Sequence, residues 1–353
     1  MNYLENFEPT EEQFGAFWKY LQDINVTDVD YNGRELWITD LVRGHYRAKE
    51  EIDDRFLIQF THTIANAVNK QFNRANKVLE ADTKELRISI LHDSVSMGGI
   101  SVCIRKSPPL VRNRLRDLIT TGFCTEEMLA LLINCIKTGF NVVSGGEPGH
   151  GKTEFVKFLM QFIPDNNRVI TIEDSLELHY GDINPGSDYV ELRIEPGFDY
   201  TDAIKACLRQ NPKWLVLSEA RSAEVTYLME AWSTGIKGLT TIHLDDLRKL
   251  PDRIQNMMNN VNDADRMETR IYRYVNVGVL IRRVEDENGK IRRYIDQLCF
   301  YVRENSENKV CMLVKDGILV SREIPAEMKL KFERVGIADP FLCDMNQYIQ
   351  EGL

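Results

Sequence analysis

The chain has 353 residues, and its 44 lysines and arginines against 54 aspartates and glutamates give a net charge of −10. This length favours two domains, each large enough to bury a core. The 43% of hydrophobic and 28% of charged residues are typical of a globular chain. The acidic balance argues against broad, sequence-independent binding to nucleic acid, so no stable direct nucleic-acid complex is expected.

Cysteine usage and hydropathy exclude further classes of protein. The seven cysteines are scattered without a Cys-x-x-Cys pair, which excludes a four-cysteine zinc module and favours reduced thiols in the cytoplasm. The first residues have no basic flank and no apolar segment typical of a signal peptide. The longest apolar run, 128–136, is interrupted by Asn134 and is too short to cross a bilayer. Any membrane association is therefore expected to be peripheral.

The first hundred residues predict a mixed α+β module. Thr10 and Gln13 form a capping box ahead of a helix with apolar residues at helical spacing. Strand-like runs at 26–31 and 36–39 flank an Asn-Gly pair, which indicates a β-hairpin. The remaining elements expected in this module are an amphipathic helix at 52–68 and two strands at 86–90 and 100–104.

A Ser-Pro-Pro run at 107–109 breaks the pattern and indicates a linker. We therefore predict an N-terminal α+β domain at 1–106, a linker at 107–118, and a larger domain at 119–353 that includes a C-terminal extension. In the larger domain, strands separated by helices predict a mostly parallel sheet with helices on both faces. The strands are expected at 141–144, 168–172, 190–194, 214–217, 239–242, 275–281, 295–302 and 310–314, and the helices at 125–137, 153–163, 201–210 and 223–232.

Residues 146–153 fit the phosphate-loop pattern G-x-x-x-x-G-K-[ST] between an apolar strand and an amphipathic helix. Glycines in such a loop let successive backbone N–H groups face phosphate oxygens, and the helix dipole favours the negative charge. Lys152 is expected on the β- and γ-phosphates and Thr153 on Mg²⁺, so the predicted ligands are ATP and Mg²⁺. The alternative is a glycine-rich turn that happens to hold a lysine. The residues expected to line the phosphates are Gly146, Glu147, Pro148, Gly149, His150, Gly151, Lys152 and Thr153.

Charged residues follow three of the predicted strands, at the edge where ligands bind open α/β sheets. Glu219 is expected to hold Mg²⁺ through its waters, with a solvated strand-end charge as the plainer alternative. Glu173 and Glu177 belong to an acidic cluster that could equally be a solvated turn. His243 ends another strand, where a lone histidine is often structural.

Three further segments follow the phosphate loop in order and resemble motifs of the secretion ATPase superfamily. Residues 172–178 are similar to its aspartate box, 208–221 to its Walker B box and 234–243 to its histidine box. In the first module, 26–30 and 101–106 extend the resemblance. The superfamily includes the traffic ATPases of type IV secretion and conjugation and the motors of type II secretion and type IV pili.

Some positions depart from the superfamily's usual pattern. Lys213 stands where it usually has aspartate, Ser218 where it has glycine, and Ile236 where pilus motors often have histidine. The zinc module of type II motors is absent from the sequence. These departures favour the type IV secretion or tight-adherence pilus branch over type II and retraction motors.

The resemblance implies an α/β fold, with a RecA-like P-loop NTPase domain and a smaller N-terminal α+β domain. It implies a cytoplasmic homohexamer, peripheral at the inner membrane and bound to inner-membrane components of its machine. ATP hydrolysis would drive assembly of, or export through, a type IV secretion, conjugation or pilus machine. The alternatives are a nucleotide-gated scaffold with little turnover, and a DNA-translocating motor.

The resemblance also assigns roles to residues. Glu177 is expected to orient or deprotonate the attacking water, with Glu173 as the second candidate. Arg221 is expected to hold a carboxylate or sense the γ-phosphate, although a surface ion pair is the simpler explanation. Arg105 is expected to reach the phosphates from the first domain or from a neighbouring subunit, with a solvated strand-end arginine as its alternative.

Overall fold

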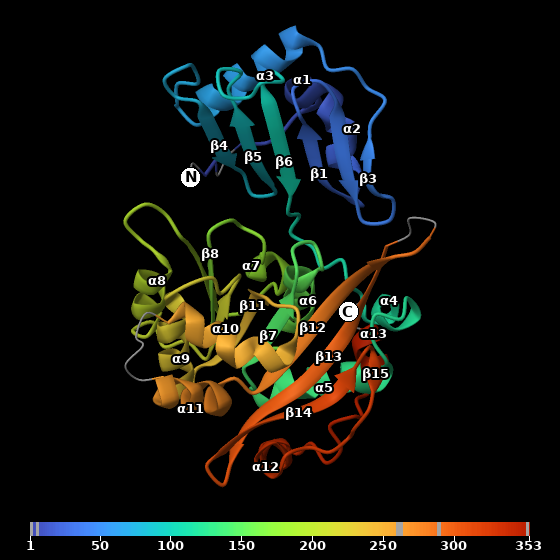
Figure 1. Ribbon diagram of the computed structural model, residues 1–353, viewed down its shortest axis with the longest axis vertical. Coiled ribbons are helices and arrows are strands. Elements are labelled where there is room, and N and C mark those ends of the chain that lie inside the picture. The colour runs from blue at the N-terminus through green and yellow to red at the C-terminus, as the bar shows by residue number, and fades with distance from the viewer. Residues whose placement is uncertain (1–2, 5–6, 259–263, 288–290, 351–352) are drawn as a thin grey trace. The chain divides into compact units, whose positions relative to one another are not determined.

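The computed structural model describes residues 1–353 except 1–2, 5–6, 259–263, 288–290 and 351–352. The chain forms two compact units (Figure 1). The first comprises Met1–Pro109 with the short segments Ser175–Glu177 and Glu285–Ile291, and the second comprises Leu110–Asp174, Leu178–Val284 and Arg292–Leu353. The exact extent of the linker stays a prediction, although its residues from Leu115 onward already lie in a helix.

The first unit is built on an antiparallel six-stranded sheet with the order β3-β2-β1-β6-β5-β4. Helical segments contribute Phe14, Phe17 and Phe60 to the same apolar core as Val29 and Ile88 of the sheet. The strands are β1 (Val26–Tyr31), β2 (Leu36–Asp40), β3 (Gly44–Arg47), β4 (Val78–Asp82), β5 (Leu86–Leu91) and β6 (Ser101–Lys106), and the helices are α1 (Glu11–Phe14), α2 (Trp18–Gln22) and α3 (Asp54–Ala67).

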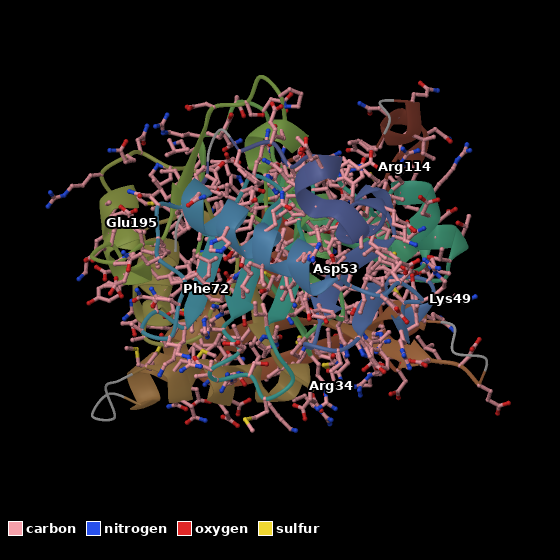
Figure 2. All side chains as sticks on the ribbon, turned by 90° about the horizontal axis from the view of Figure 1, so that it is seen from above. Arg34, Lys49, Asp53, Phe72, Arg114 and Glu195 are labelled. Atoms are coloured by element: carbon pink, nitrogen blue, oxygen red, sulfur yellow. The ribbon has the colours of Figure 1, made fainter. Side chains whose placement is uncertain are left out.

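Local signals in this unit are confirmed. The capping box of Thr10 and Gln13 is formed, and the helix expected at 52–68 is α3, which begins directly after Asp53 (Figure 2). The first helix is interrupted, because Gly15 takes a positive φ of 44° and a 3₁₀ turn at Gly15–Phe17 separates α1 from α2. Gly33 closes the predicted hairpin with a φ of 90° and packs against Gly98, where a Cβ would lie 2.6 Å from the Gly98 carbonyl carbon. Strands β3 and β4 were not predicted.

The second unit contains a nine-stranded sheet with the order β15-β14-β13-β12-β7-β11-β10-β8-β9. The six strands from β12 to β9 in this order are parallel to one another, and β14 and β15 extend the other edge in antiparallel fashion. The strands are β7 (Val142–Gly146), β8 (Val169–Glu173), β9 (Tyr189–Arg193), β10 (Trp214–Leu217), β11 (Lys237–His243), β12 (Val277–Glu285), β13 (Ile291–Glu304), β14 (Glu307–Lys315) and β15 (Ile318–Leu319).

Helices cover both faces of this sheet, as the alternation of strands and helices predicts. Val142 of β7 packs into one apolar core with α5 and α6, whereas its neighbour Val143 packs into a second core with α8, α9 and α10. Strand β7 therefore lies buried in the middle of the unit (Figure 1). The helices are α4 (Leu115–Thr120), α5 (Glu126–Thr138), α6 (Lys152–Met160), α7 (Tyr180–Ile183), α8 (Tyr200–Cys207), α9 (Glu224–Ser233), α10 (Leu250–Met257), α11 (Ala264–Tyr274), α12 (Ala326–Arg334) and α13 (Met345–Gln350).

The predicted fold class, a RecA-like α/β domain with a smaller α+β domain, is confirmed. The helix expected at 153–163 ends earlier, at Met160. The pairs Asn288-Gly289 and Asp316-Gly317 separate the last predicted strands, and such pairs are typical of turns. The turn at Asp316-Gly317 is present, with φ values of 52° and 77°, whereas Asn288-Gly289 lies outside the described residues. Within the described ranges, no helix is both long and apolar enough to cross a membrane.

Candidate functional site

The phosphate loop has the strand–loop–helix arrangement that its sequence predicts. Strand β7 ends at Gly146, and α6 begins at Lys152. Gly146, Gly149 and Gly151 have φ values of 150°, 75° and 92°, which L side chains rarely adopt. A Cβ on Gly146 would lie 2.7 Å from the carbonyl oxygen of Ile281 in β12. Glycine is therefore required at this position by both conformation and space.

Lys152 is turned toward the end of β11. Its buried Nζ donates to the carbonyl oxygen of Glu147 at 3.0 Å and lies 3.2 Å from Nδ1 of His243. His243 pairs in register with Gly146, because β11 is the direct neighbour of β7 in the sheet. The lysine and the histidine thus meet at the carboxyl edge of the sheet, where a phosphate group would be held.

Glu219, which follows β10, is held from two sides. Its Oε1 lies 2.8 Å from Nε2 of His243, and its Oε2 lies 2.8 Å from Nη2 of Arg221. The other guanidinium nitrogen, Nη1 of Arg221, donates to Oδ2 of Asp174 at 2.7 Å. Lys152, His243, Glu219, Arg221 and Asp174 therefore form one continuous polar chain, which we call the strand-end network.

Electrostatics keep the guanidinium of Arg221 charged. Burial lowers the pKa of Arg221, but its hydrogen bond to Glu219 and the charges of Asp174 and Glu219 outweigh that effect and raise the pKa above its ordinary value. A permanently charged arginine between two carboxylates fixes the direction in which Glu219 points. Arg221 does form ion pairs, but its partners are Asp174 and Glu219 of the strand-end network.

Three other candidate residues, Glu173, Glu177 and Arg105, lie outside the strand-end network as defined above. Glu173 is fully buried, and its Oε2 accepts a hydrogen bond from the backbone N–H of Leu178 at 3.0 Å, so it fixes the chain after β8. Glu177 and Arg105 belong to the first unit, where Nε of Arg105 donates to Oδ1 of Asp28 at 2.8 Å. The catalytic roles of Glu173, Glu177 and Arg105 stay predictions.

His150 contacts β12, on the side of the phosphate loop opposite to β11. Its Nδ1 lies 3.0 Å from the carbonyl oxygen of Ile281 and 3.3 Å from the backbone nitrogen of Glu147. Burial lowers the pKa of His150, which favours the neutral imidazole. The side chain of His150 therefore connects the phosphate loop to β12.

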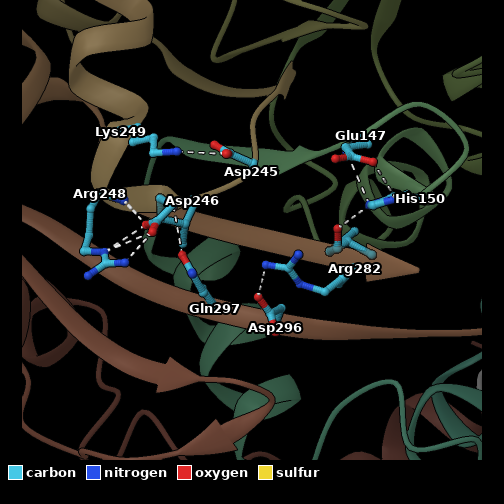
Figure 3. Close-up of polar contacts among 11 residues, drawn as sticks. Glu147, His150, Asp245, Asp246, Arg248, Lys249, Arg282, Asp296 and Gln297 are labelled. Atoms are coloured by element: carbon cyan, nitrogen blue, oxygen red, sulfur yellow. Dashed lines mark hydrogen bonds and ion pairs between the residues drawn. The ribbon is translucent and has the colours of Figure 1, made fainter. Parts of the chain in front are cut away.

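A cavity of about 500 Å³ opens beside the loop, a volume within the range of small-molecule sites. Lys249 at its wall pairs with Asp245 at 2.8 Å, and Gln297 accepts a hydrogen bond from the backbone of Leu247 at 2.9 Å (Figure 3). Sequence reasoning missed this wall, although Asp246 as N-cap and Pro251 in the first turn of α10 signal a helix there. The lining residues are Glu147, Pro148, His243, Leu244, Asp245, Lys249, Asp252, Arg253 and Asn256.

The sequence of the chain is similar to those of several known proteins. An uncharacterized protein of Bacillus anthracis is 29% identical over 300 residues, which are 82% of this chain and 67% of that protein. The type IV secretion system protein VirB11 of Brucella suis is 27% identical over 316 residues, which are 80% of this chain and 87% of VirB11.

Two solved structures have the same fold. The ATPase DotB of Legionella pneumophila matches with a TM-score of 0.60 and 17% identity over 83% of this chain and 82% of its own. The pilus retraction motor PilT with bound ADP matches with a TM-score of 0.58 and 14% identity over 93% of this chain and 87% of its own. The family described as type II/IV secretion system protein matches residues 38–314. Because that match spans most of the chain and includes the phosphate loop and the strand-end network, the chain belongs to the family of type II/IV secretion system ATPases.

Proposed function

We propose that the chain binds MgATP at residues 146–153 and hydrolyses it to ADP and phosphate. The observation that supports this most directly is the strand-end network, which joins the phosphate-loop lysine to Glu219 through His243. In this reaction a water attacks the γ-phosphorus in line with the departing ADP oxygen, and catalysis consists mainly of positioning and charge neutralisation.

The residues present fit a magnesium nucleotide. Thr153 in the first turn of α6 and Glu219 offer oxygen ligands, the type that Mg²⁺ prefers. Among the described residues, no three His, Cys, Asp or Glu side chains gather as a metal site. When bound, Mg²⁺ would neutralise charge on the phosphates. Lys152 adds a further positive charge there, and Arg221 keeps Glu219 oriented.

We further propose that hydrolysis drives assembly of, or export through, a type IV secretion, conjugation or pilus machine. The similarity to VirB11 of Brucella suis over 80% of the chain supports the type IV branch. In this proposal the chain works as a homohexamer at the cytoplasmic face of the inner membrane, in contact with inner-membrane components of the machine.

Phosphate release by the purified full chain tests the enzymatic part. Lys152→Ala is expected to reduce release to background while the fold is kept, because it removes the positive charge beside the phosphates together with local contacts to the Glu147 carbonyl oxygen and His243. Lys315→Ala is the matched control, since Lys315 is an exposed lysine of β14 in the same unit and lies outside the motifs, and it is expected to keep wild-type turnover.

Other outcomes point to the alternatives. Tight MgATP binding with negligible turnover in the wild type would indicate a nucleotide-gated scaffold. Turnover that rises strongly when duplex or single-stranded DNA is added would indicate a DNA-translocating motor instead.

A further inference from the structure

Arg293 lies on the flank of the phosphate loop that faces away from the strand-end network. Arg293 of β13 donates from Nε to the carbonyl oxygen of Gly149 at 3.2 Å. Its Cδ lies 3.4 Å from the position that a Cβ on Gly151 would occupy. Strand β7 has β11 on one side and β12 on the other, and β13 lies beyond β12. Arg293 therefore packs on the β12 side of the loop, whereas Lys152 and His243 meet on the β11 side.

Arg112 has buried donor groups that nothing described satisfies. Its Nε and Nη2 are buried and have no hydrogen-bond partner among the described residues. In the described part of the chain, no carboxylate forms an ion pair with Arg112 or Arg293. Burial lowers the pKa of Arg293, and the nearby charges of Arg283 and Arg112 lower it further, so these cations repel one another.

Such an arrangement is unfavourable unless an anion joins it. A guanidinium group does not give up its proton in a protein, so an arginine with buried, unpartnered nitrogens cannot avoid the cost by becoming neutral. Polar groups that are buried without partners destabilise the folded state. Sites that keep such groups are typically binding sites, where a ligand supplies the missing partner.

We propose that Arg112 and Arg293 form a phosphate subsite on the β12 side of the loop, which takes the α-phosphate end of the bound nucleotide. This inference rests on the proposed function. If the γ-phosphate lies at Lys152 and His243 on the β11 side, the phosphate chain crosses the loop toward β12. The planar fork of arginine matches two phosphate oxygens at once. A separate free phosphate is the other source of the same chemistry.

Isothermal titration of the full chain with ADP tests the subsite. Arg112→Gln is expected to weaken ADP binding about tenfold or more, the loss expected for a charge-assisted hydrogen bond. Arg116→Gln is the matched control, because it removes the same charge from an exposed position on α4, and it is expected to leave ADP affinity unchanged. Arg293→Lys keeps the charge but loses the fork, and it is expected to weaken ADP binding in the same direction.

Thermal unfolding separates a binding role from a structural one. Without nucleotide, Arg112→Gln is expected to melt no lower than the wild type, because repulsion is relieved and its Nε and Nη2 have no described hydrogen bond to lose. With ADP, its gain in melting temperature is expected to be smaller than that of the wild type. A lower melting temperature without ligand, together with an unchanged gain from ADP, would overturn the proposal.

Two parallel titrations distinguish the remaining outcomes. If Arg112→Gln binds ADP normally but loses the binding of inorganic phosphate seen in the ADP-saturated wild type, the assignment to the nucleotide is overturned in favour of a separate anion. If Lys152→Ala abolishes ADP binding while the arginine variants bind ADP and phosphate normally, only the subsite is wrong. If Lys152→Ala also binds ADP normally, the proposed function itself fails.

Discussion

Glu219 is oriented by two side chains, His243 and Arg221, each with a nitrogen 2.8 Å from one of its carboxylate oxygens. Glu219→Gln keeps the size of the side chain but removes its charge, so both contacts weaken and the amide is a poorer magnesium partner. We expect slower turnover and a shift of the magnesium dependence to higher concentration. Steady-state phosphate release measured over a magnesium titration checks this, and an unchanged magnesium profile would contradict it.

Glu177 carries a different prediction, taken from the family's aspartate box. Glu177→Gln is expected to bind MgATP as tightly as the wild type yet to lose about 10²-fold or more in kcat, the size of a general-base contribution. MgATP affinity and kcat measured on the same preparation check this. Wild-type kcat in the variant rejects Glu177 as the base, and Glu173→Gln is then the next variant to measure.

The candidate residues at strand ends could be predicted because the rule behind them is topological. An apolar strand followed by a charged residue places that residue at the ligand-binding edge of a parallel sheet, which is how Glu219 and His243 were found. Asp174 follows β8 in the same way and belongs to the acidic cluster of the sequence, but its ion pair with Arg221 had to come from the structure. The cavity wall around Lys249 also had to come from the structure.

At the level of single elements, Asn141 fixes the start of β7 between its two neighbours. Its Oδ1 accepts from the backbone N–H of Gly238 in β11 at 2.9 Å, and its Nδ2 donates to the carbonyl oxygen of Tyr274 at 2.7 Å. The side chain is buried. It therefore satisfies backbone groups on both sides of the strand that leads into the phosphate loop.

Asn141→Ala leaves those two backbone groups without partners. We expect the free energy of unfolding to fall by on the order of 3 kcal/mol, since each buried unsatisfied group costs about 1–3 kcal/mol. Urea denaturation measures the change. Asn166→Ala, in an exposed turn, is the control and is expected to be nearly neutral. Equal stability of the two variants would show that Asn141 does not hold the strand.

Elements with local signals were predicted well, and those defined by distant partners were not. Thr125 caps α5 because its hydroxyl oxygen accepts a hydrogen bond from the backbone N–H of Met128, and that signal lies within four residues of sequence. Strand β3, with the sequence GHYR, has no apolar alternation and exists because β2 pairs with it. Strand β13 runs over Ile291–Glu304, well beyond the expected 295–302, because its neighbours β12 and β14 prolong the pairing.

For the whole molecule, the family resemblance predicts a ring. Multi-angle light scattering with nucleotide present is expected to give a mass near six times the 40.9 kDa protomer. The physical reason is that, in this superfamily, a neighbouring subunit completes the nucleotide site. A strict monomer with full phosphate release at the same concentration would contradict this expectation.

The central position of β7 has a consequence for synthesis on the ribosome. Its two neighbours, β11 and β12, begin at Lys237 and Val277, so about 90 further residues must be made before β7 finds its first partner. At translation rates of roughly 5–20 residues per second this takes on the order of 5–20 s. Throughout that interval the apolar faces of α5 and α6 have no completed sheet to cover them.

The first sheet needs no such wait, because all six of its strands have been made once Lys106 is reached. A nascent chain stalled before Lys237 is therefore expected to carry a protease-resistant N-terminal module and a phosphate loop unable to retain nucleotide. Pulse proteolysis of stalled chains would reveal this order. Chaperones are expected to bind the residues made after Lys106 and before Lys237, while their sheet is incomplete.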